Sequence, residues 1–300
     1  MIGTPRRTLS VLVLVASLFR SAICLAAAPS AADNPFAAHN AYPWRLYPKD
    51  RFDRALNSGL KHLEVDVTYD PTRRAAIATH DAEPTGKETE LGELLTPLWK
   101  KWGAAPDDGH TLIIDFKSAS PDLVSAVATV LAAQRKLLSS APKSNPGNFQ
   151  PGKITVCLSG TGAAHRVYWD SVPADGELIA FSDDTGRPGS WQEDPASYVP
   201  QQPVGFVRFI SLEKQNFMDA PRSRGDDHIS VERMRQAIAA ADAGGYRLRI
   251  YTVNPGRRTG GDGWNTAYWD ACVAAGVHMI ATDAYDVARD YWQKRASAPH

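Results

Sequence analysis

Cysteine is scarce in this sequence, with three residues in a chain of 300. None of the three lies in a histidine-based activation signature, which argues against a cysteine nucleophile. Cys157 and Cys272 lie far apart, in segments with strand-like and helix-like patterns. A disulfide between them would need an oxidising compartment. We expect two buried free thiols instead, because free cysteine is among the most buried residue types.

Charge of one sign is also lacking. The formal net charge is +0 at pH 7, and no dense run of Lys and Arg follows the first residues. Nucleic-acid binders usually carry a basic stripe, so a nucleic-acid partner is not expected. Hydrophobic residues make up 43% and charged residues 22%, as in a globular protein with a full core. The length suits one α/β barrel of about 250 residues or two average domains, and no internal repeat is visible.

The only long apolar run is at the N-terminus, where residues 1–32 have the pattern of a signal peptide. A positive pair, Arg6–Arg7, precedes a short apolar run at 9–19, and small residues follow. The apolar run is too short for a comfortable membrane span. We expect cleavage before Asp33, export to the periplasm or the medium, and a single folded domain over 33–300. An uncleaved anchor is the alternative.

Beyond this segment, short strand-like runs alternate with amphipathic helical segments, which favours a parallel sheet. The predicted strands are 36–39, 62–67, 75–79, 111–116, 154–158, 178–182, 206–211, 248–253 and 277–281. The predicted helices are 49–58, 91–102, 121–140, 163–169, 230–243, 266–275 and 285–294. Nine strands are one more than a closed eight-stranded barrel needs. Either 178–182 or 206–211 is then accessory, or 75–79 lies outside the barrel wall.

Charged and imidazole side chains stand at the ends of four successive short apolar runs. In chain order they are His39, Glu64, Asp66, His80, Asp115 and Lys117. Side chains two positions apart on a strand point the same way, so Glu64 and Asp66 share one face. By the same rule Asp115 and Lys117 share a face. Because the strands of a parallel sheet are covered on both sides, these charges need partners.

Two interpretations provide those partners. Three converging carboxylates offer the oxygen ligands that Mg²⁺ or Ca²⁺ prefers. The alternative is a structural ion-pair network, in which Lys117 holds Asp115 and an arginine holds Glu64. Either pair alone fits both interpretations, but the two pairs together, at neighbouring strand ends, favour the cation. Glu64, Asp66 and Asp115 are therefore the candidate metal ligands.

His39 and His80 end their strands, which is where barrel enzymes place catalytic groups. An imidazole near neutral pKa can take a proton from an attacking hydroxyl and give one to a departing alkoxide. A lone histidine is more often structural, but two that flank an acidic pair favour catalysis. Lys117 is a candidate for neutralising a phosphate oxygen, and a salt bridge within the barrel is an equally good role.

Three further residues are candidate substrate contacts: Asn40, Arg187 and Asn254. Asn40 follows the first histidine, and Arg187 lies in a long loop rich in Gly, Pro and Asp. Asn254, like Asp283, ends a later strand, where capping of the next helix is an alternative role. The aromatic patch 42–44 either lines a substrate pocket or packs against the barrel rim.

Taken together, these motifs resemble the superfamily of glycerophosphodiester phosphodiesterases and phosphatidylinositol-specific phospholipases C. The resembling order is a histidine near the start, Glu-x-Asp, His-Asp and an acid-x-Lys, and segments 251–254 and 274–283 look like the superfamily's last two strands. The resemblance implies a TIM-type (β/α)8 barrel, an α/β fold, that hydrolyses phosphodiesters with a divalent cation. It also implies that the three acids bind the metal and that His39 and His80 act as general acid and base.

The sequence departs from the superfamily pattern in three places. Asn40 and Ala41 replace the usual Arg-Gly, so a phosphate-contacting arginine is missing there. The stretch from His80 to Asp115 is too short for the usual insertion, and the third acid is Asp rather than Glu. This compact form looks more like a branch that includes the fungal "altered inheritance of mitochondria" proteins. Sphingomyelinase D-type phospholipases are also similar, but their cysteines after the second histidine are absent.

We therefore expect an exported, metal-dependent phosphodiesterase acting on glycerophosphodiester- or phosphoinositide-type bonds in small molecules or lipids. The alternatives are a sphingomyelinase D-like phospholipase, a barrel that binds phospho-head groups without catalysis, and a glycosidase, which would leave both histidines idle. No long amphipathic helix suggests stable membrane docking, so at most a transient membrane contact is expected. The head group, the native cation, a cyclic product and the oligomeric state stay open.

Overall fold

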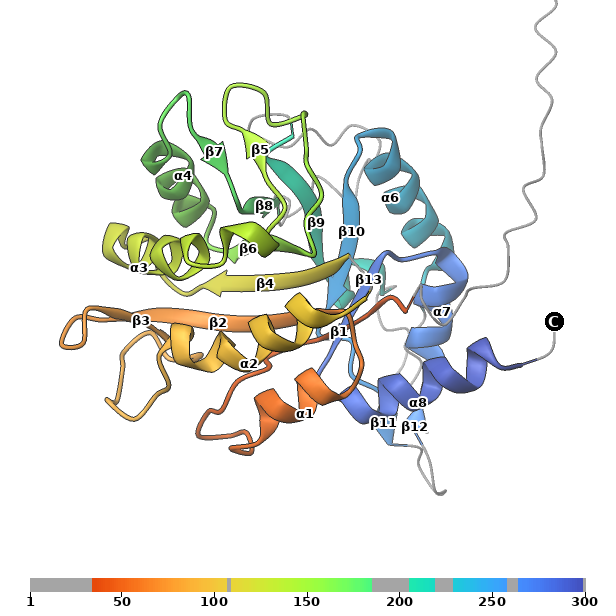
Figure 1. The fold of residues 1–300 in the computed structure, drawn as a ribbon. Helices are drawn as coiled ribbons and strands as arrows, with labels where there is room; N and C mark the ends of the chain where they lie inside the picture. The colour runs from red at the N-terminus through yellow and green to blue at the C-terminus, as the bar shows by residue number, and fades with distance from the viewer. Residues whose placement is uncertain (1–33, 107–108, 185–204, 219–228, 258–263, 299–300) are drawn as a thin grey trace, which may run out of the picture.

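The computed structural model describes residues 34–106, 109–184, 205–218, 229–257 and 264–298. Within these residues, eight parallel strands close into a barrel (Figure 1). In wall order they are β1 (Phe36–Ala38), β2 (His62–Asp70), β4 (His110–Phe116), β6 (Ile154–Gly160), β8 (Phe181–Asp184), β9 (Val207–Glu213), β10 (Arg247–Tyr251) and β13 (Met279–Thr282). Strand β1 pairs with both β2 and β13, which closes the wall. The predicted TIM-type barrel is confirmed.

The ninth predicted strand, 75–79, lies outside the barrel wall as β3 (Ala75–Ala78). It runs antiparallel to the last residues of β2, with Val67 opposite Ala78. Because β2 continues beyond the wall, it offers a free edge to which the returning chain can pair. An antiparallel strand is not part of a parallel wall, so of the three alternatives the correct one is that 75–79 lies outside the barrel.

The predicted strand 178–182 is divided between two sheets. Its first residue belongs to β7 (Glu177–Leu178), which pairs antiparallel with β5 (Ala141–Pro142). The wall strand β8 begins three residues later, and its register with β9 shifts between Ser182 and Asp183. This irregular strand nevertheless places the Asp183 side chain inside the barrel, where it accepts a hydrogen bond from Ser159 of β6.

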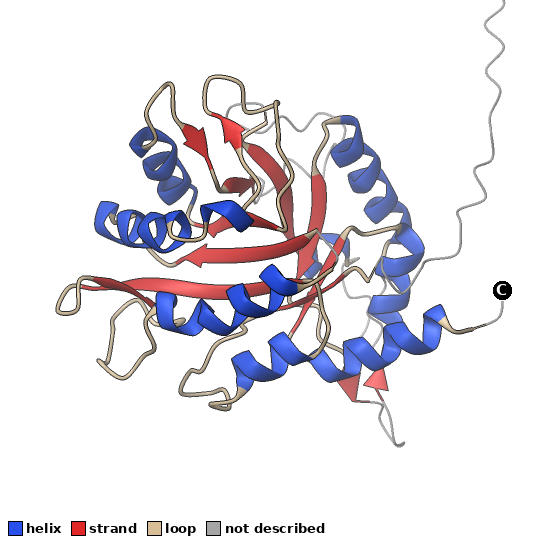
Figure 2. Cartoon of the chain, viewed as in Figure 1, coloured by secondary structure: helices blue, strands red, loops and turns tan. Residues whose placement is uncertain are grey.

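Helices cover the outside of the wall (Figure 2). They are α1 (Arg51–Asn57), α2 (Leu91–Ala104), α3 (Pro121–Ala132), α4 (Gly162–Ser171), α6 (Val231–Ala243), α7 (Ala267–Ala275) and α8 (Tyr285–Ala296). Ser230 caps α6 by accepting a hydrogen bond from the Arg233 backbone N–H. The predicted helix 121–140 ends earlier, at Ala132; a 3-10 turn follows at Arg135–Leu137, and Leu138 then bridges Ile154 of β6.

Short elements complete the described fold. Two 3-10 turns, η2 (Arg135–Leu137) and η4 (Lys214–Phe217), follow α3 and β9. Strands β11 (Gly256–Arg257) and β12 (Trp264–Asn265) form a separate antiparallel pair. None of the helices that the structure describes has the length and apolarity needed to cross a bilayer.

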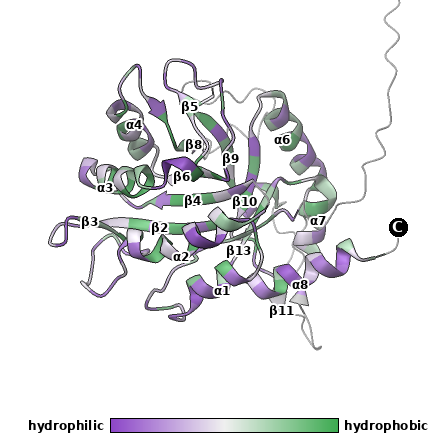
Figure 3. Cartoon of the chain, in the orientation of Figure 1, coloured by the Kyte–Doolittle hydropathy of each residue, from purple (hydrophilic) through white to green (hydrophobic). Residues whose placement is uncertain are grey.

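Apolar side chains form two clusters, one on each side of the wall. Figure 3 shows that hydrophobic and hydrophilic residues both occur along the strands of the wall. Because strand faces alternate, Leu63, Val65 and Val67 of β2 face the helices, while Glu64 and Asp66 face the barrel interior. The smaller cluster lies in the barrel interior and consists of Ala37, Ile113, Cys157, Phe209, Met279 and Ala281. It forms an apolar layer within the same interior as the charged residues. The two described cysteines are buried and free, as expected.

Candidate active site

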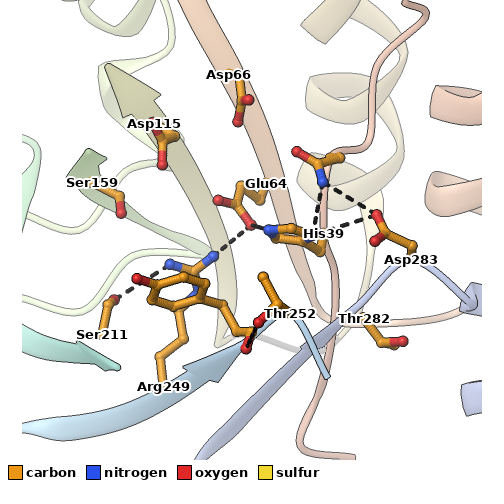
Figure 4. Close-up of polar contacts among 12 residues, drawn as sticks. His39, Glu64, Asp66, Asp115, Ser159, Ser211, Arg249, Thr252, Thr282 and Asp283 are labelled. Carbon is orange, nitrogen blue, oxygen red and sulfur yellow. Dashed lines mark hydrogen bonds and ion pairs between the residues drawn. The ribbon is translucent and has the colours of Figure 1, made fainter. Parts of the chain in front are cut away.

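The carboxyl ends of the barrel strands bring four of the predicted site residues together, namely His39, Glu64, Asp66 and Asp115 (Figure 4). Glu64 and Asp66 project from β2 and Asp115 from β4. His39 is the first residue after β1, and Asp283 is the first after β13. Because β1 and β13 are neighbours in the wall, these last two residues adjoin.

Glu64, Asp66 and Asp115 form an acidic cluster in which one oxygen of each lies within 4.8 Å of the others. Asp66 stands opposite Asp115 in the parallel register, so their carboxylates leave adjacent strands side by side. The Asp66 side chain is 1% exposed and that of Asp115 19% exposed. Oxygens of this kind and spacing fit a hard divalent cation. The residues expected to bind the metal therefore do converge.

Two cations also reach the acidic cluster. Lys117 Nζ lies 2.8 Å from Asp66 Oδ2 and 3.0 Å from Asp115 Oδ1. The Arg249 guanidinium pairs with Glu64 Oε2. The contacts of the ion-pair alternative are thus present as well. Even so, each acid keeps one oxygen to which no described residue donates a hydrogen bond.

Asp66 is the most heavily bonded of the three acids. Its Oδ2 accepts hydrogen bonds from Tyr42 Oη at 2.7 Å and from His80 Nδ1 at 2.6 Å, besides the contact with Lys117. Burial raises the pKa of this carboxyl, but the His80 hydrogen bond and the Lys117 charge outweigh burial and hold the pKa below its usual value. Asp66 is therefore an ionised, firmly oriented carboxylate.

The carboxylate of Glu64 is stabilised mainly by one cation, the guanidinium of Arg249. Burial raises the pKa of the Glu64 carboxyl above the ordinary value, although the charge of Arg249 opposes this rise. Arg249 is itself 2% exposed and also donates from Nη1 to Ser211 Oγ at 3.4 Å. Burial lowers the pKa of the Arg249 guanidinium, but the charge of Glu64 outweighs burial and raises the pKa above its usual value, so Arg249 stays charged. The pair is a fixed charge contact across the barrel interior.

His39 lies between two carboxylates. Its Nε2 is 3.7 Å from Glu64 Oε2, and its Nδ1 is 3.4 Å from Asp283 Oδ1. Asn40 Nδ2 also approaches Nδ1, at 2.8 Å. Burial lowers the pKa of His39, but Glu64 and Asp283 together raise it above its ordinary value. The imidazole can therefore carry a proton near neutral pH.

The backbone at His39 is held from outside the wall. Tyr285 Oη donates to the His39 carbonyl at 2.6 Å, and Arg51 Nε donates to the Asn40 carbonyl at 2.6 Å. Arg51 also pairs with Asp283. Asn40 has a φ of 53°, in the left-handed region that asparagine tolerates better than most residues. These contacts fix the turn that presents the imidazole.

His80 reaches the site by a different path from the predicted one. It follows β3, which is outside the wall, so it does not end a barrel strand. The antiparallel hairpin returns the chain to the rim, where the Thr79 N–H donates to the Asp66 carbonyl at 3.1 Å. The His80 side chain is 54% exposed and lies against the Trp44 ring, with centroids 5.4 Å apart. The two imidazoles thus face different members of the acidic cluster.

Two of the predicted substrate contacts, Asn40 and Asn254, are hydrogen-bonded to Asp283. Asn254 Nδ2 donates to Asp283 Oδ2 at 2.7 Å, and its Oδ1 accepts from the Asp283 N–H at 2.7 Å. Asn40 likewise lies 3.3 Å from Asp283 Oδ1. Both amides therefore position Asp283 beside His39. Arg187 lies outside the described residues.

Sequence reasoning missed Arg249 and Arg51, although Asp283 was noted at its strand end. Arg249 had a detectable signal, because two-residue alternation with Tyr251 in β10 puts an arginine on an interior face. Arg51 had none, since it acts through the carbonyls of a turn more than ten residues earlier in the chain.

Two solved structures are similar to this chain. A glycerophosphodiester phosphodiesterase from Parabacteroides distasonis superposes with a TM-score of 0.54 at 12% identity, over 87% of this chain and 97% of that one. A Ca²⁺-dependent phosphatidylinositol-specific phospholipase C from Streptomyces antibioticus gives a TM-score of 0.49 at 14% identity, over 87% and 96%. The first likeness shows the shared barrel fold. Comparisons with models of protein families and with curated proteins give no match.

Proposed function

We propose that this protein is a divalent-cation-dependent phosphodiesterase of the glycerophosphodiester phosphodiesterase and phospholipase C superfamily. The observation that carries the proposal is the acidic cluster flanked by two imidazoles, each with its own carboxylate contact. His80 contacts Asp66, and His39 lies near Glu64 and Asp283. Fold likeness to a phosphodiesterase supports the same class.

The acidic cluster would hold Mg²⁺ or Ca²⁺ through Glu64, Asp66 and Asp115. When bound, such a cation supplies positive charge to a phosphate oxygen. One imidazole takes the proton of the attacking hydroxyl, and the other returns a proton to the departing alkoxide. Lys117 supplies further positive charge for the phosphate oxygens. The hydroxyl belongs to water or to the substrate itself, in which case a cyclic phosphodiester forms.

The test is product analysis by ³¹P NMR on a panel of glycerophosphodiesters, phosphoinositides and bis-p-nitrophenyl phosphate, with Mg²⁺ or Ca²⁺. His39→Ala and His80→Ala are expected to abolish turnover while the circular dichroism spectrum stays unchanged. His278→Ala is the matched control, because His278 pairs with Asp242, away from the acidic cluster. Full activity in either site variant, or in metal-free protein, would reject the proposal.

A barrel that binds phospho-head groups without catalysis is the second candidate. The observation that favours it is that Lys117 and Arg249 already form ion pairs with the acids. Calorimetric binding of glycerophosphoinositol without turnover of any phosphodiester in the panel would support it. A sphingomyelinase D-like phospholipase would instead release choline from sphingomyelin, which a choline assay detects.

We also propose export, with residues 1–32 as a signal peptide. The support is the sequence pattern of a positive pair, a short apolar run and small residues. These residues lie outside the described part of the structure. Mass spectrometry of the protein expressed with its native N-terminus is expected to find a mature chain that begins at Asp33.

A further inference from the structure

Lys117 occupies the place between two of the three acids. Its ammonium lies within hydrogen-bond distance of both Asp66 and Asp115, and the side chain is 20% exposed. The ammonium is therefore a resident positive charge at the acidic cluster.

We infer that Lys117 is a placeholder for the divalent cation and that the metal binds by exchange with its ammonium. The inference rests on the proposed function, because it takes the acidic cluster to be the metal site. A divalent ion held by the same carboxylates would lie within a few ångströms of Nζ, where like charges repel strongly in a partly buried site. Lys117 would then lower the affinity for the metal and move aside when the metal enters.

The anchoring of Lys117 is suited to exchange. Its backbone N–H donates to the Val67 carbonyl at 3.1 Å, so the chain at its root is held by β2. The four-carbon side chain is flexible, and its ammonium has no hydrogen-bonded partner among the described residues other than the two acids. Displacement would therefore cost only side-chain contacts and leave the barrel wall unchanged.

The other members of the cluster would stay in place. Arg249 is 2% exposed and is bonded to both Glu64 and Ser211, so burial and these contacts hold it in place. Asp66 keeps its hydrogen bonds from Tyr42 and His80 after Lys117 leaves. The carboxylates would thus remain oriented to hold the metal.

The experiment is isothermal titration calorimetry with Ca²⁺ and with Mg²⁺ on metal-stripped protein. Lys117→Met is expected to tighten metal binding about tenfold or more, because a like charge has been removed from the site. Lys117→Arg, which keeps the charge, is expected to retain weak binding. The matched control is Lys49→Met, which removes the same charge from an exposed position in the loop after β1; its affinity is expected to stay within about twofold of the unaltered protein.

Thermal denaturation supplies a second measurement. Without metal, Lys117→Met is expected to melt at a lower temperature than the unaltered protein, because two adjacent carboxylates lose their shared cation. Saturating Ca²⁺ is expected to remove most of that difference. Lys117→Gln serves the same purpose if the methionine variant does not fold.

The outcomes separate this inference from the proposed function. Unchanged or weaker metal binding in Lys117→Met overturns the placeholder role, even if the protein hydrolyses phosphodiesters. Tighter binding in that variant supports the role, even if no phosphodiester is hydrolysed and the proposed function fails. Absence of metal binding in every variant overturns both.

Discussion

The ion pair between Arg249 and Glu64 offers the sharpest test of how this site is held together. Glu64 is 3% exposed and Arg249 2% exposed, and the guanidinium is the principal cation that stabilises the carboxylate. Arg249→Met keeps most of the side-chain volume but leaves Glu64 without it. Breaking a buried pair by removing one partner costs about 3–5 kcal/mol. For a domain of this size that loss corresponds to a fall in Tm of roughly 6–20 °C.

The double variant Arg249→Met/Glu64→Gln is the control, because it removes both charges. A buried ion pair replaced by neutral groups of similar volume is often close to neutral in stability, so most of the loss is expected to return. The loss in the single variant is also expected to shrink as the pH falls. Burial raises the folded-state pKa of Glu64, so the folded state binds the extra proton and its stability falls as pH rises.

Denaturation with guanidinium chloride, in EDTA at pH 5 and pH 8, measures the free energy of unfolding of the unaltered protein, the single variant and the double variant. EDTA is needed because a bound cation would substitute for the missing guanidinium. A loss below about 1 kcal/mol in Arg249→Met, the range of an exposed ion pair, would show that Glu64 does not depend on the arginine. A double variant as unstable as the single variant would show that the cost comes from packing.

Four further outcomes are expected. Asp283→Asn removes a carboxylate that raises the pKa of His39, so the limb of the kcat/KM profile that reports His39 moves to lower pH. Burial raises the pKa of Asp283, but partners including His39 and Asn254 outweigh it and lower the pKa to about 2. The contribution of Asp283 to stability is therefore present above about pH 4 and is lost between about pH 4 and 2. Acid denaturation of Asp283→Asn beside the unaltered protein measures this loss. EDTA is expected to stop phosphodiester turnover, and excess Mg²⁺ or Ca²⁺ to restore it. Tyr42→Phe deletes one donor to Asp66 and is expected to lower the free energy of unfolding by about 1–3 kcal/mol in chemical denaturation, and a change within about 0.5 kcal/mol would contradict the role given to that hydrogen bond.

Much of the site was predictable because it depends on neighbours along one strand. Alternation alone predicted that Glu64 and Asp66 share a face and that Asp115 and Lys117 do too. The structure places all four side chains in one cluster. The barrel itself was predictable from strands that alternate with helices, together with the family resemblance.

Other features depended on pairings that no local pattern records. The position of β3 depended on β2 extending past the wall, so nine predicted strands did not reveal which lay outside. His80 was predicted at the correct end of the barrel for the wrong reason, because a hairpin returns it to the rim.

What the sequence determined by itself is the set of chemical groups and the strand face on which each lies, since side-chain direction follows from a two-residue repeat. What only the tertiary structure decided is which charges meet. Closure of the wall brings Asp283 to His39 and Arg249 to Glu64 from strands far along the chain. Those contacts depend on register and closure of the whole barrel, and they decide the protonation state on which any chemistry at this site depends.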